Sequence, residues 1–313
     1  MSDNNDTQPL VSIAICTYNG GLFLREQLDS IIHQTYKQLE IVIVDDGSTD
    51  NTTEIIEVYR QQDSRIQFFQ NEKNLGYNKN FEKACQLCTG NYIAISDQDD
   101  IWEMKKIETI MNAWPAGSLY VYSLSGNFSG NDFVGRTPAP KVRYTDIDDI
   151  HKLVFNSPVH GHACMFKKEL LAYCIPFPEN IFYDWWMSMH AAAIGVIGCI
   201  PETLTWHRVH EKNSSRLLME IKNQEEKDRQ LREQMINFIE TFCNSTNKAI
   251  TQKESLLKYS SLLKNMNGRK FSLAMFLYVF KRRKLIFHYK RKKPFLFISE
   301  LKHAFKMAKR GLL

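Results

Sequence analysis

The chain has 313 residues, of which 43% are apolar and 24% are charged, and its formal net charge at pH 7 is +5. A chain of this length and apolar content can bury a full hydrophobic core, which excludes an intrinsically disordered protein. Residues 1–9 are polar and acidic and lack the basic start and apolar stretch of a secretory signal, so we expect a cytoplasmic protein.

The positive charge is concentrated towards the C-terminus. Residues 264–313 contain 15 Lys and Arg and a single acid, Glu300, which gives a net charge of +14. Residues 1–263 carry a net charge of −9. We therefore expect the two parts of the chain to face different partners.

The seven cysteines form an odd set that is scattered through apolar or helical segments. This distribution indicates reduced thiols rather than a disulfide framework. Cys85-x-x-Cys88 has no second pair to complete a zinc site, so we assign it neither a metal nor a redox role.

The first hundred residues alternate short β-branched runs with amphipathic helical patterns. Strands are expected over 11–15, 39–44, 66–69 and 92–95, and helices over 21–34, from about 49, and over 77–87. This alternation predicts an α/β fold with a mostly parallel, doubly wound sheet. In such sheets, ligands bind outside the carboxyl ends of the strands.

Polar residues follow three of these strands. The first strand is followed by Thr17-Tyr18-Asn19-Gly20, the second by Asp45-Asp46-Gly47-Ser48, and the fourth by the acidic turn Asp97-Gln98-Asp99-Asp100, which precedes Ile101-Trp102. Carboxylates are hard oxygen ligands, so the acidic turn can hold a divalent cation against a diphosphate. We expect a helix directly after this turn, and capping of that helix is the alternative role of its carboxylates.

The sequence lacks two common nucleotide-binding loops. Neither Gly-x-Gly-x-x-Gly nor Gly-x-x-x-x-Gly-Lys occurs, which speaks against a dinucleotide enzyme or a P-loop NTPase. We therefore expect carboxylates to bind the nucleotide.

Beyond residue 115 the pattern loosens into mixed strands and loops up to about residue 210. Three motifs stand out there: Gly161-His162-Ala163-Cys164-Met165-Phe166, Tyr183-Asp184-Trp185-Trp186 and Arg208-Val209-His210-Glu211-Lys212-Asn213. Residues 215–242 and 252–264 then have helical patterns.

Together these motifs resemble the family 2 glycosyltransferases with the GT-A fold. The run Asp-Gln-Asp-Asp-Ile-Trp is similar to that of a subgroup of bacterial rhamnosyltransferase-like proteins of polysaccharide synthesis. The resemblance covers residues 10–215 in one order, over 11–20, 43–50, 74–81, 97–102, 161–166, 184–186 and 208–213.

The resemblance implies a division of the chain. Residues 1–214 would form a GT-A catalytic domain, a nucleotide-diphospho-sugar transferase fold with a Rossmann-like, mostly parallel sheet. Its nucleotide-sugar half would span about 10–115 and its acceptor half about 116–214. Residues 215–313 would form a helical, basic C-terminal extension of the variable kind that such enzymes carry.

The resemblance also implies a nucleotide site at the first two strand ends. Thr17, Tyr18, Asn19 and Asp45 would surround the base and ribose of the donor. Asp45 would accept the imide N–H of a pyrimidine, for which a carboxylate is a suitable acceptor.

The expected cofactor is Mg²⁺ or Mn²⁺, which would bridge the two phosphates and neutralise the leaving diphosphate. The resemblance implies that Asp99 ligates the metal directly and that Asp97 binds the ribose or the metal through water. His210 would close over the donor and can ligate the metal, with Arg208 reaching the diphosphate and Lys79 touching the donor. For His210 and Lys79, a solvated loop histidine and an exposed helix lysine are the ordinary alternatives.

Asp184 is the candidate general base. Inverting transfer is a single in-line displacement, so one carboxylate must take the proton of the acceptor hydroxyl. The residues alone allow equally that Asp184 caps the helix that begins here, and the resemblance favours the base. Trp185, Trp186 and His162 would line the acceptor pocket, with core packing as the alternative for either Trp.

The basic tail interleaves apolar runs with cationic clusters. Its apolar run 271–280 has ten residues, too few to cross a bilayer. Basic amphipathic helices lie on anionic membranes, so we expect residues 264–313 to hold the protein peripherally on the inner face of the cell membrane. Packing on the catalytic domain or on a sister chain is the alternative, and we expect no nucleic-acid partner because no binding motif is present.

The sequence therefore predicts an inverting, metal-dependent glycosyltransferase of bacterial surface polysaccharide synthesis. It would move rhamnose or a hexose from a dTDP- or UDP-sugar to a saccharide or lipid-linked saccharide. A sugar nucleotidyltransferase is the alternative enzyme, but residues 17–21 lack its glycine-rich, basic loop. A degenerate GT-A membrane scaffold is the non-enzymatic alternative, but it would have lost carboxylates that this chain keeps. The oligomeric state stays open.

Overall fold

The computed structural model describes residues 8–130, 132–140, 144–155, 157–211, 223–246, 252–266, 271–289 and 296–311. The chain divides into two compact units. The first unit consists of residues 1–140, 159–187 and 197–209, and the second of residues 141–158, 188–196 and 210–313. The predicted boundary at residue 214 lies outside the described residues and stays a prediction.

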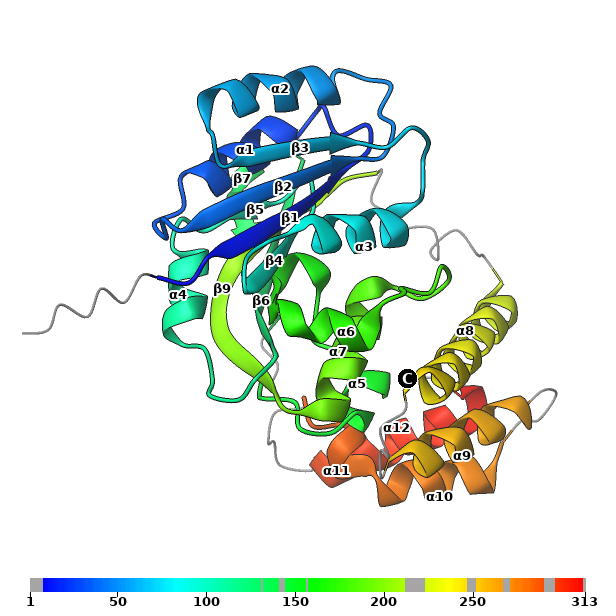
Figure 1. The fold of residues 1–313 in the computed structure, drawn as a ribbon. Helices are drawn as coiled ribbons and strands as arrows, with labels where there is room; N and C mark the ends of the chain where they lie inside the picture. The colour runs from blue at the N-terminus through cyan, green and yellow to red at the C-terminus, as the bar shows by residue number, and fades with distance from the viewer. Residues whose placement is uncertain are drawn as a thin grey trace, which may run out of the picture. The chain divides into compact units, whose positions relative to one another are not determined.

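A nine-stranded sheet forms the centre of the described part of the first unit (Figure 1). Its order is β3-β2-β1-β4-β8-β6-β9-β5, with β7 paired to β6. The strands are β1 (Val11–Thr17), β2 (Leu39–Asp45), β3 (Ile66–Gln70), β4 (Tyr92–Ser96), β5 (Ile101–Trp102), β6 (Tyr120–Ser129), β7 (Asp132–Thr137), β8 (Cys164–Lys167) and β9 (Ile197–Val209).

The parallel order predicted for the first four strands is confirmed. β1 pairs in parallel with β2 and β4, and β2 pairs in parallel with β3. The other half of the sheet is mixed, because β8 runs antiparallel to β4 and β6, whereas β6 and β9 are parallel. The carboxyl ends of β1, β2 and β4 therefore meet at one edge of the sheet.

Helices connect the first four strands at the predicted places. They are α1 (Leu24–Ile32), α2 (Thr52–Gln62) and α3 (Tyr77–Leu87). Alternate residues of β1, namely Val11, Ile13 and Ile15, share one buried core cluster with apolar residues of α1, α2 and α4 (Lys106–Asn112). α3 packs on β1 and β2 and covers the other face (Figure 1). Side chains of a strand point alternately to the two faces, which explains why both faces of β1 and β2 are apolar.

The helix expected directly after the acidic turn begins later than predicted. Residues Ile101–Trp102 first form β5, which pairs antiparallel with β9 through Ile101 and Trp206, and α4 begins only at Lys106. The acidic turn is thus held between two strands. Helix capping, the alternative role of its carboxylates, does not apply.

The second unit is mainly helical. Its helices are α5 (His151–Phe155), α8 (Gln224–Ser245), α9 (Lys253–Lys264), α10 (Leu273–Lys281), α11 (Arg283–Ile286) and α12 (Leu296–Arg310). α8 and α9 correspond to the two helices predicted here, although 215–222 lie outside the described residues. Arg310 on α12 forms two hydrogen bonds of 2.5 and 2.6 Å with Asp228 on α8.

A buried histidine ties the first segment of the second unit to its helices. His151 Nδ1 lies 2.7 Å from Asp149 Oδ1, and His151 Nε2 lies 2.9 Å from the hydroxyl of Ser255 on α9.

No helix among the described residues is long and apolar enough to span a bilayer. All seven cysteines are free thiols, in line with the prediction that they form no disulfide framework.

Candidate functional site

The carboxyl ends of β1 and β2 meet at Thr17 and Asp45, which are direct partners in the parallel register. The Thr17 hydroxyl donates to Asp45 Oδ1 at 2.8 Å, and the Ser48 N–H donates to Asp45 Oδ2 at 2.9 Å. Thr17 and Asp45 are both buried. The structure thus brings together two of the residues predicted for the nucleotide, and their contact with a base stays a prediction.

Tyr18 and Asn19 form the loop after β1. Asn19 has a φ of 49°, a left-handed conformation that asparagine tolerates, and its N–H donates to Ser48 Oγ at 2.8 Å. Tyr18 and Gln98 exchange two hydrogen bonds, from Tyr18 N–H to Gln98 Oε1 at 2.9 Å and from Gln98 Nε2 to the Tyr18 carbonyl at 3.1 Å. The Tyr18 ring remains 48% exposed. The loop after β1 and the acidic turn are therefore fixed to each other.

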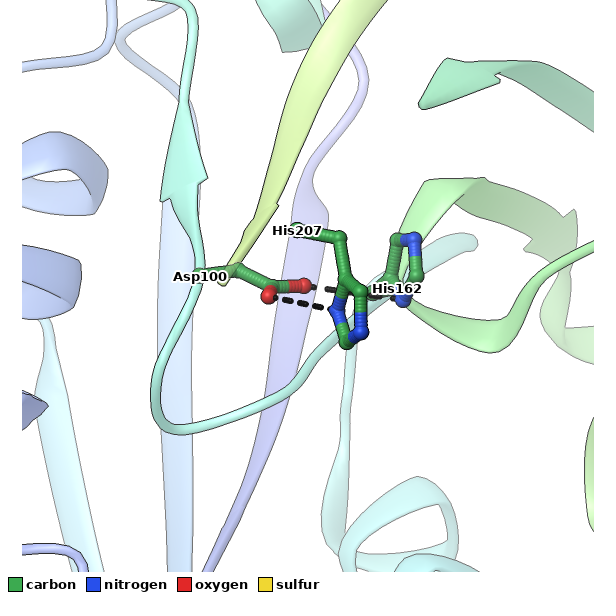
Figure 2. A group of neighbouring side chains, drawn as sticks. All are labelled: Asp100, His162 and His207. Carbon is green, nitrogen blue, oxygen red and sulfur yellow. Dashed lines mark hydrogen bonds and ion pairs between the residues drawn. The ribbon is translucent and has the colours of Figure 1, made fainter. Parts of the chain in front are cut away.

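Asp100, His162 and His207 converge in a buried cluster (Figure 2). They come from the acidic turn, from the 3-10 helix η1 (Gly161–Ala163) and from β9. His207 Nδ1 lies 3.0 Å from Asp100 Oδ1, and His162 Nδ1 lies 3.5 Å from Asp100 Oδ2. One ligand atom from each residue lies within 4.8 Å of the others, a spacing at which they could hold a metal ion.

The charges in this cluster stabilise one another. Burial opposes the charge of Asp100, but His162, His207 and the Arg208 N–H lower the pKa of its carboxyl below the ordinary value. Burial also opposes the charge of His207, yet its hydrogen bond to Asp100 and the nearby carboxylates raise its pKa to about 9. At neutral pH His207 is therefore an imidazolium that donates to Asp100, and this ion pair holds the acidic turn against β9.

The predicted metal ligand Asp97 lies beside this cluster. Its Oδ2 is 3.5 Å from His162 Nδ1, and its side chain is half-buried. Asp99 is also half-buried, and its backbone carbonyl accepts the Nε–H of Arg208 at 2.8 Å. His210 follows the last residue of β9 and belongs to the second unit, so its role as a ligand stays a prediction. Asn213, the last residue of that motif, lies outside the described residues.

Arg208 occupies a different position from the one that the resemblance implied. Its side chain is completely buried, with the guanidinium 4.3 Å from the ring of Phe23 and 4.5 Å from the ring of Phe128. Besides Asp99, it donates to the carbonyl of Gly130 and, at 2.8 Å, to the carboxylate of Glu26. In this structure Arg208 braces the acidic turn and does not present its guanidinium to a diphosphate.

Asp184 lies in the first turn of α7 (Tyr183–Ile194) and is half-buried. Its Oδ1 accepts the Trp185 N–H at 2.7 Å, and its Oδ2 accepts the Gly161 N–H at 3.0 Å. Asp184 is the second residue of α7 and reaches across to η1, which is not the geometry of an N-cap. Burial raises the pKa of its carboxyl, against the two N–H groups that lower it. A fixed carboxylate with a raised pKa is suited to general-base catalysis.

Three further predicted residues have definite positions. Trp186 is 3% exposed, and its indole N–H donates to the Cys174 carbonyl at 2.8 Å, so core packing describes it better than an acceptor pocket. Trp185 is half-buried. Lys79, in the first turn of α3, pairs with Glu82 at 3.0 Å.

The sequence reasoning included Asp100 only as part of the acidic turn, and it missed His207 and Lys106. Lys106 is completely buried; its ammonium donates to the His162 carbonyl at 2.7 Å and lies 3.4 Å from the centre of the Trp102 ring. Burial lowers the pKa of Lys106 to about 7. Successive side chains of a strand point to opposite faces, so His207 and Arg208 on β9 lie on different faces of the sheet. This alternation is the sequence signal that could have indicated different environments for the two residues.

The comparisons with known proteins identify the family. Residues 12–174, more than half of the chain, match the family model described as Glycosyl transferase family 2. The Escherichia coli protein UDP-Glc:alpha-D-GlcNAc-diphosphoundecaprenol beta-1,3-glucosyltransferase WfgD is 30% identical over 183 residues, which are 58% of this chain and 69% of that protein. The chain spans between 45% and 69% of the length of five curated relatives that it matches.

Two solved structures share the fold. Residues 1–349 of TarS from S. aureus, in complex with UDP-GlcNAc, superpose with a TM-score of 0.59 at 19% identity, covering 88% of this chain and 81% of that one. The mannosyltransferase PcManGT from Pyrobaculum calidifontis, in complex with GDP-Man and Mn2+, has a TM-score of 0.56 at 17% identity and covers 96% and 86%. The chain therefore has the GT-A fold and belongs to glycosyl transferase family 2, so it is a glycosyltransferase.

Proposed function

We propose that the protein transfers a sugar, with inversion, from a nucleoside diphosphate sugar to a hydroxyl of a saccharide or lipid-linked saccharide in bacterial surface polysaccharide synthesis. The observation that carries this proposal is a connected set of contacts at one edge of the sheet. Asp45, the acidic turn and Asp184 are linked there through the Tyr18–Gln98, Asp97–His162 and Gly161–Asp184 contacts. The residues proposed for the donor and the candidate base therefore belong to one unit.

The proposed donor is a dTDP- or UDP-linked sugar. Thr17, Tyr18, Asn19 and Asp45 would surround its nucleoside, and the exposed Tyr18 ring offers an aromatic face for stacking. The names of two similar proteins support a uridine diphosphate donor, because WfgD is described with UDP-Glc and TarS with UDP-GlcNAc. A rhamnose donor is the other choice, because the acidic turn resembles that of rhamnosyltransferase-like proteins.

A divalent cation, Mg²⁺ or Mn²⁺, fits the acidic turn. Asp97 and Asp99 would supply carboxylate oxygens, which such cations prefer, and the resemblance adds His210. Asp100 Oδ2 is buried and accepts no hydrogen bond from the described residues, although His162 Nδ1 lies 3.5 Å from it. When bound, the cation would offset the charge that develops on the leaving diphosphate. The Mn2+ in the mannosyltransferase complex supports this proposal.

Asp184 would act as the general base. As the acceptor oxygen attacks the anomeric carbon, Asp184 takes the proton of that hydroxyl, and the bond from the anomeric carbon to the diphosphate oxygen breaks. The N–H groups of Gly161 and Trp185 keep the carboxylate in one orientation. Trp185, next to the base, would contact the acceptor sugar.

A panel of nucleotide sugars tests the proposal. Binding is measured by calorimetry with and without Mn²⁺ or Mg²⁺, and the release of free nucleoside diphosphate is then followed. We expect one donor to bind in a metal-dependent way and to be hydrolysed slowly in the absence of an acceptor. Equal, metal-independent binding of all donors, with no release of nucleoside diphosphate, would contradict it.

A further inference from the structure

α10 and α12 pack against each other in the second unit. A continuous band of phenylalanine rings joins the two helices. The ring of Phe305 lies 5.1 Å from that of Phe271, and Phe271 lies 6.2 Å from Phe276. Phe276 lies 5.8 Å from Phe280, which lies 6.0 Å from Phe297. Five rings thus form one apolar surface that crosses both helices.

Three rings of this phenylalanine band, Phe271, Phe297 and Phe305, are exposed, and the other two are half-buried. The seven large apolar side chains that are between 37% and 62% exposed around it are Phe271, Leu273, Leu277, Phe297, Ile298, Leu301 and Phe305. On α12, Phe297, Leu301 and Phe305 are four residues apart and form one stripe. Other residues of the same helices, among them Met275, Val279, Ala304 and Met307, are buried in the core of the unit. The exposed face is therefore additional to the core of the unit, and a group of neighbouring exposed apolar side chains is typical of an interaction site.

Exposed cations surround the band. Lys281, Lys284, Lys302, Lys306 and Lys309 are all exposed. Lys309 lies 5.0 Å from the centre of the Phe305 ring, and Arg283 lies 4.7 Å from that of Phe280.

The single acid of this region does not offset these charges at the surface. Glu300 is buried, and its Oε2 lies 3.5 Å from Arg283 Nε. The described residues of α10, α11 and α12 therefore present apolar and positive groups without an exposed acid. The complementary surface is apolar and negative.

We infer that the face formed by α10 and α12 binds the surface of a bilayer that contains anionic lipids. A headgroup layer over acyl chains offers both complements at once, negative charge for the lysines and hydrocarbon for the phenylalanines. α10 and α12 have 9 and 15 residues, too few to span a bilayer, so the helices lie in the plane of the interface. The lipid binding is independent of sugar transfer, and only its link to a lipid-linked acceptor rests on the proposed function.

Vesicle flotation of the full chain tests this inference. The protein is mixed with vesicles of phosphatidylcholine alone or of phosphatidylcholine with phosphatidylglycerol, and the bound fraction is measured. We expect binding to the anionic vesicles only, with a lower affinity as the salt concentration rises. The double variant Phe297→Ser/Phe305→Ser should bind at least tenfold more weakly, because each buried phenylalanine contributes through its apolar area. The triple variant Lys302→Glu/Lys306→Glu/Lys309→Glu should bind roughly a hundredfold more weakly, at about a fivefold loss for each lysine removed from the anionic surface.

A matched control comes from α9 of the same unit. Leu257 is 40% exposed, and Lys258 is also exposed, but neither belongs to the band. Leu257→Ser/Lys258→Glu should bind vesicles like the unchanged protein. Equal losses in the control and in the band variants, or no binding of the unchanged protein to anionic vesicles, would overturn the inference. So would a dimer in light scattering that the phenylalanine variant dissociates while vesicle binding stays unchanged, because the band would then cover a second copy of the chain.

Discussion

Asp184 Oδ2 accepts the backbone N–H of Gly161 at 3.0 Å, one residue before His162 of the buried cluster. The three-residue helix η1 therefore positions both the candidate base and the imidazole beside the acidic turn. A Cβ atom at Gly161 would lie 2.1 Å from the Tyr183 hydroxyl, so a larger residue would push η1 away from α7. One short segment, η1, therefore positions both the candidate base Asp184 and His162 beside the acidic turn.

Asp184→Asn should lower kcat by roughly a hundredfold or more, because the variant cannot accept the proton of the acceptor hydroxyl. Donor binding should change little, since the side chain keeps its size. Initial rates and calorimetry with the donor measure the two effects. Retained turnover in a folded variant would leave Asp184 a structural role only.

In the pH profile of kcat/KM, the decrease on the acid side should come from protonation of Asp184. Burial raises the pKa of its carboxyl, so activity should fall on the acid side at a higher pH than an ordinary Asp would give. The folded state favours the protonated form, so this group stabilises the fold below its ordinary pKa, and that contribution is lost as the pH rises through the raised pKa. Asp184→Asn should therefore lack the acid limb and should not unfold more easily at neutral pH. An unchanged acid limb in this variant would assign it to another group.

Two neighbouring substitutions separate the candidate metal ligands. Asp99→Ala should abolish the metal dependence of donor binding, because it removes a carboxylate ligand. Asp100→Asn should retain metal affinity within about tenfold and lower the free energy of unfolding by roughly 3 kcal/mol, because it removes the buried carboxylate that pairs with the half-buried His207. Calorimetry with Mn²⁺ and chemical denaturation measure these quantities. The reverse pattern would place the ion between Asp100, His162 and His207.

Arg208→Met should lower the free energy of unfolding by about 3 kcal/mol, because it leaves two carbonyls and a carboxylate without their donor. Glu26→Gln is the matched control, since it changes the half-exposed partner of the same guanidinium and should cost less than about 1 kcal/mol. Denaturant titration of both variants checks the difference. A fully stable Arg208→Met variant with a raised KM for the donor would restore the diphosphate role that the resemblance implied.

The nucleotide half of the fold could be predicted because its signals are local. β2 is buried along its whole length, and its apolar run identifies it without any knowledge of its partners. β5 could not be predicted in this way. It has two residues, and it exists because Ile101 and Trp102 pair with residues of β9 about a hundred positions away.

The roles within the site were harder to predict than its place. Asp97 and Asp184 lie where the motifs indicated, because strand ends and a helix start fix them. Arg208 was expected at the diphosphate because the resemblance implied it, and complete burial of a charged residue is rare. Its two phenylalanine neighbours and its three acceptors come from distant segments, so its burial could be recognised only once the chain was folded.

The second unit is assembled from three separate pieces of chain, with strands of the first unit between them. The hydrogen bonds of His151 to Asp149 and Ser255 fasten the first piece to a helix of the last. A helical unit of this kind cannot be exchanged by joining a different C-terminal gene fragment to the catalytic region, because two internal insertions must travel with it. Chimeric enzymes designed from this protein need five crossover points, two around each internal piece and one before residue 210, and natural change in this unit is expected to proceed by substitution rather than by recombination.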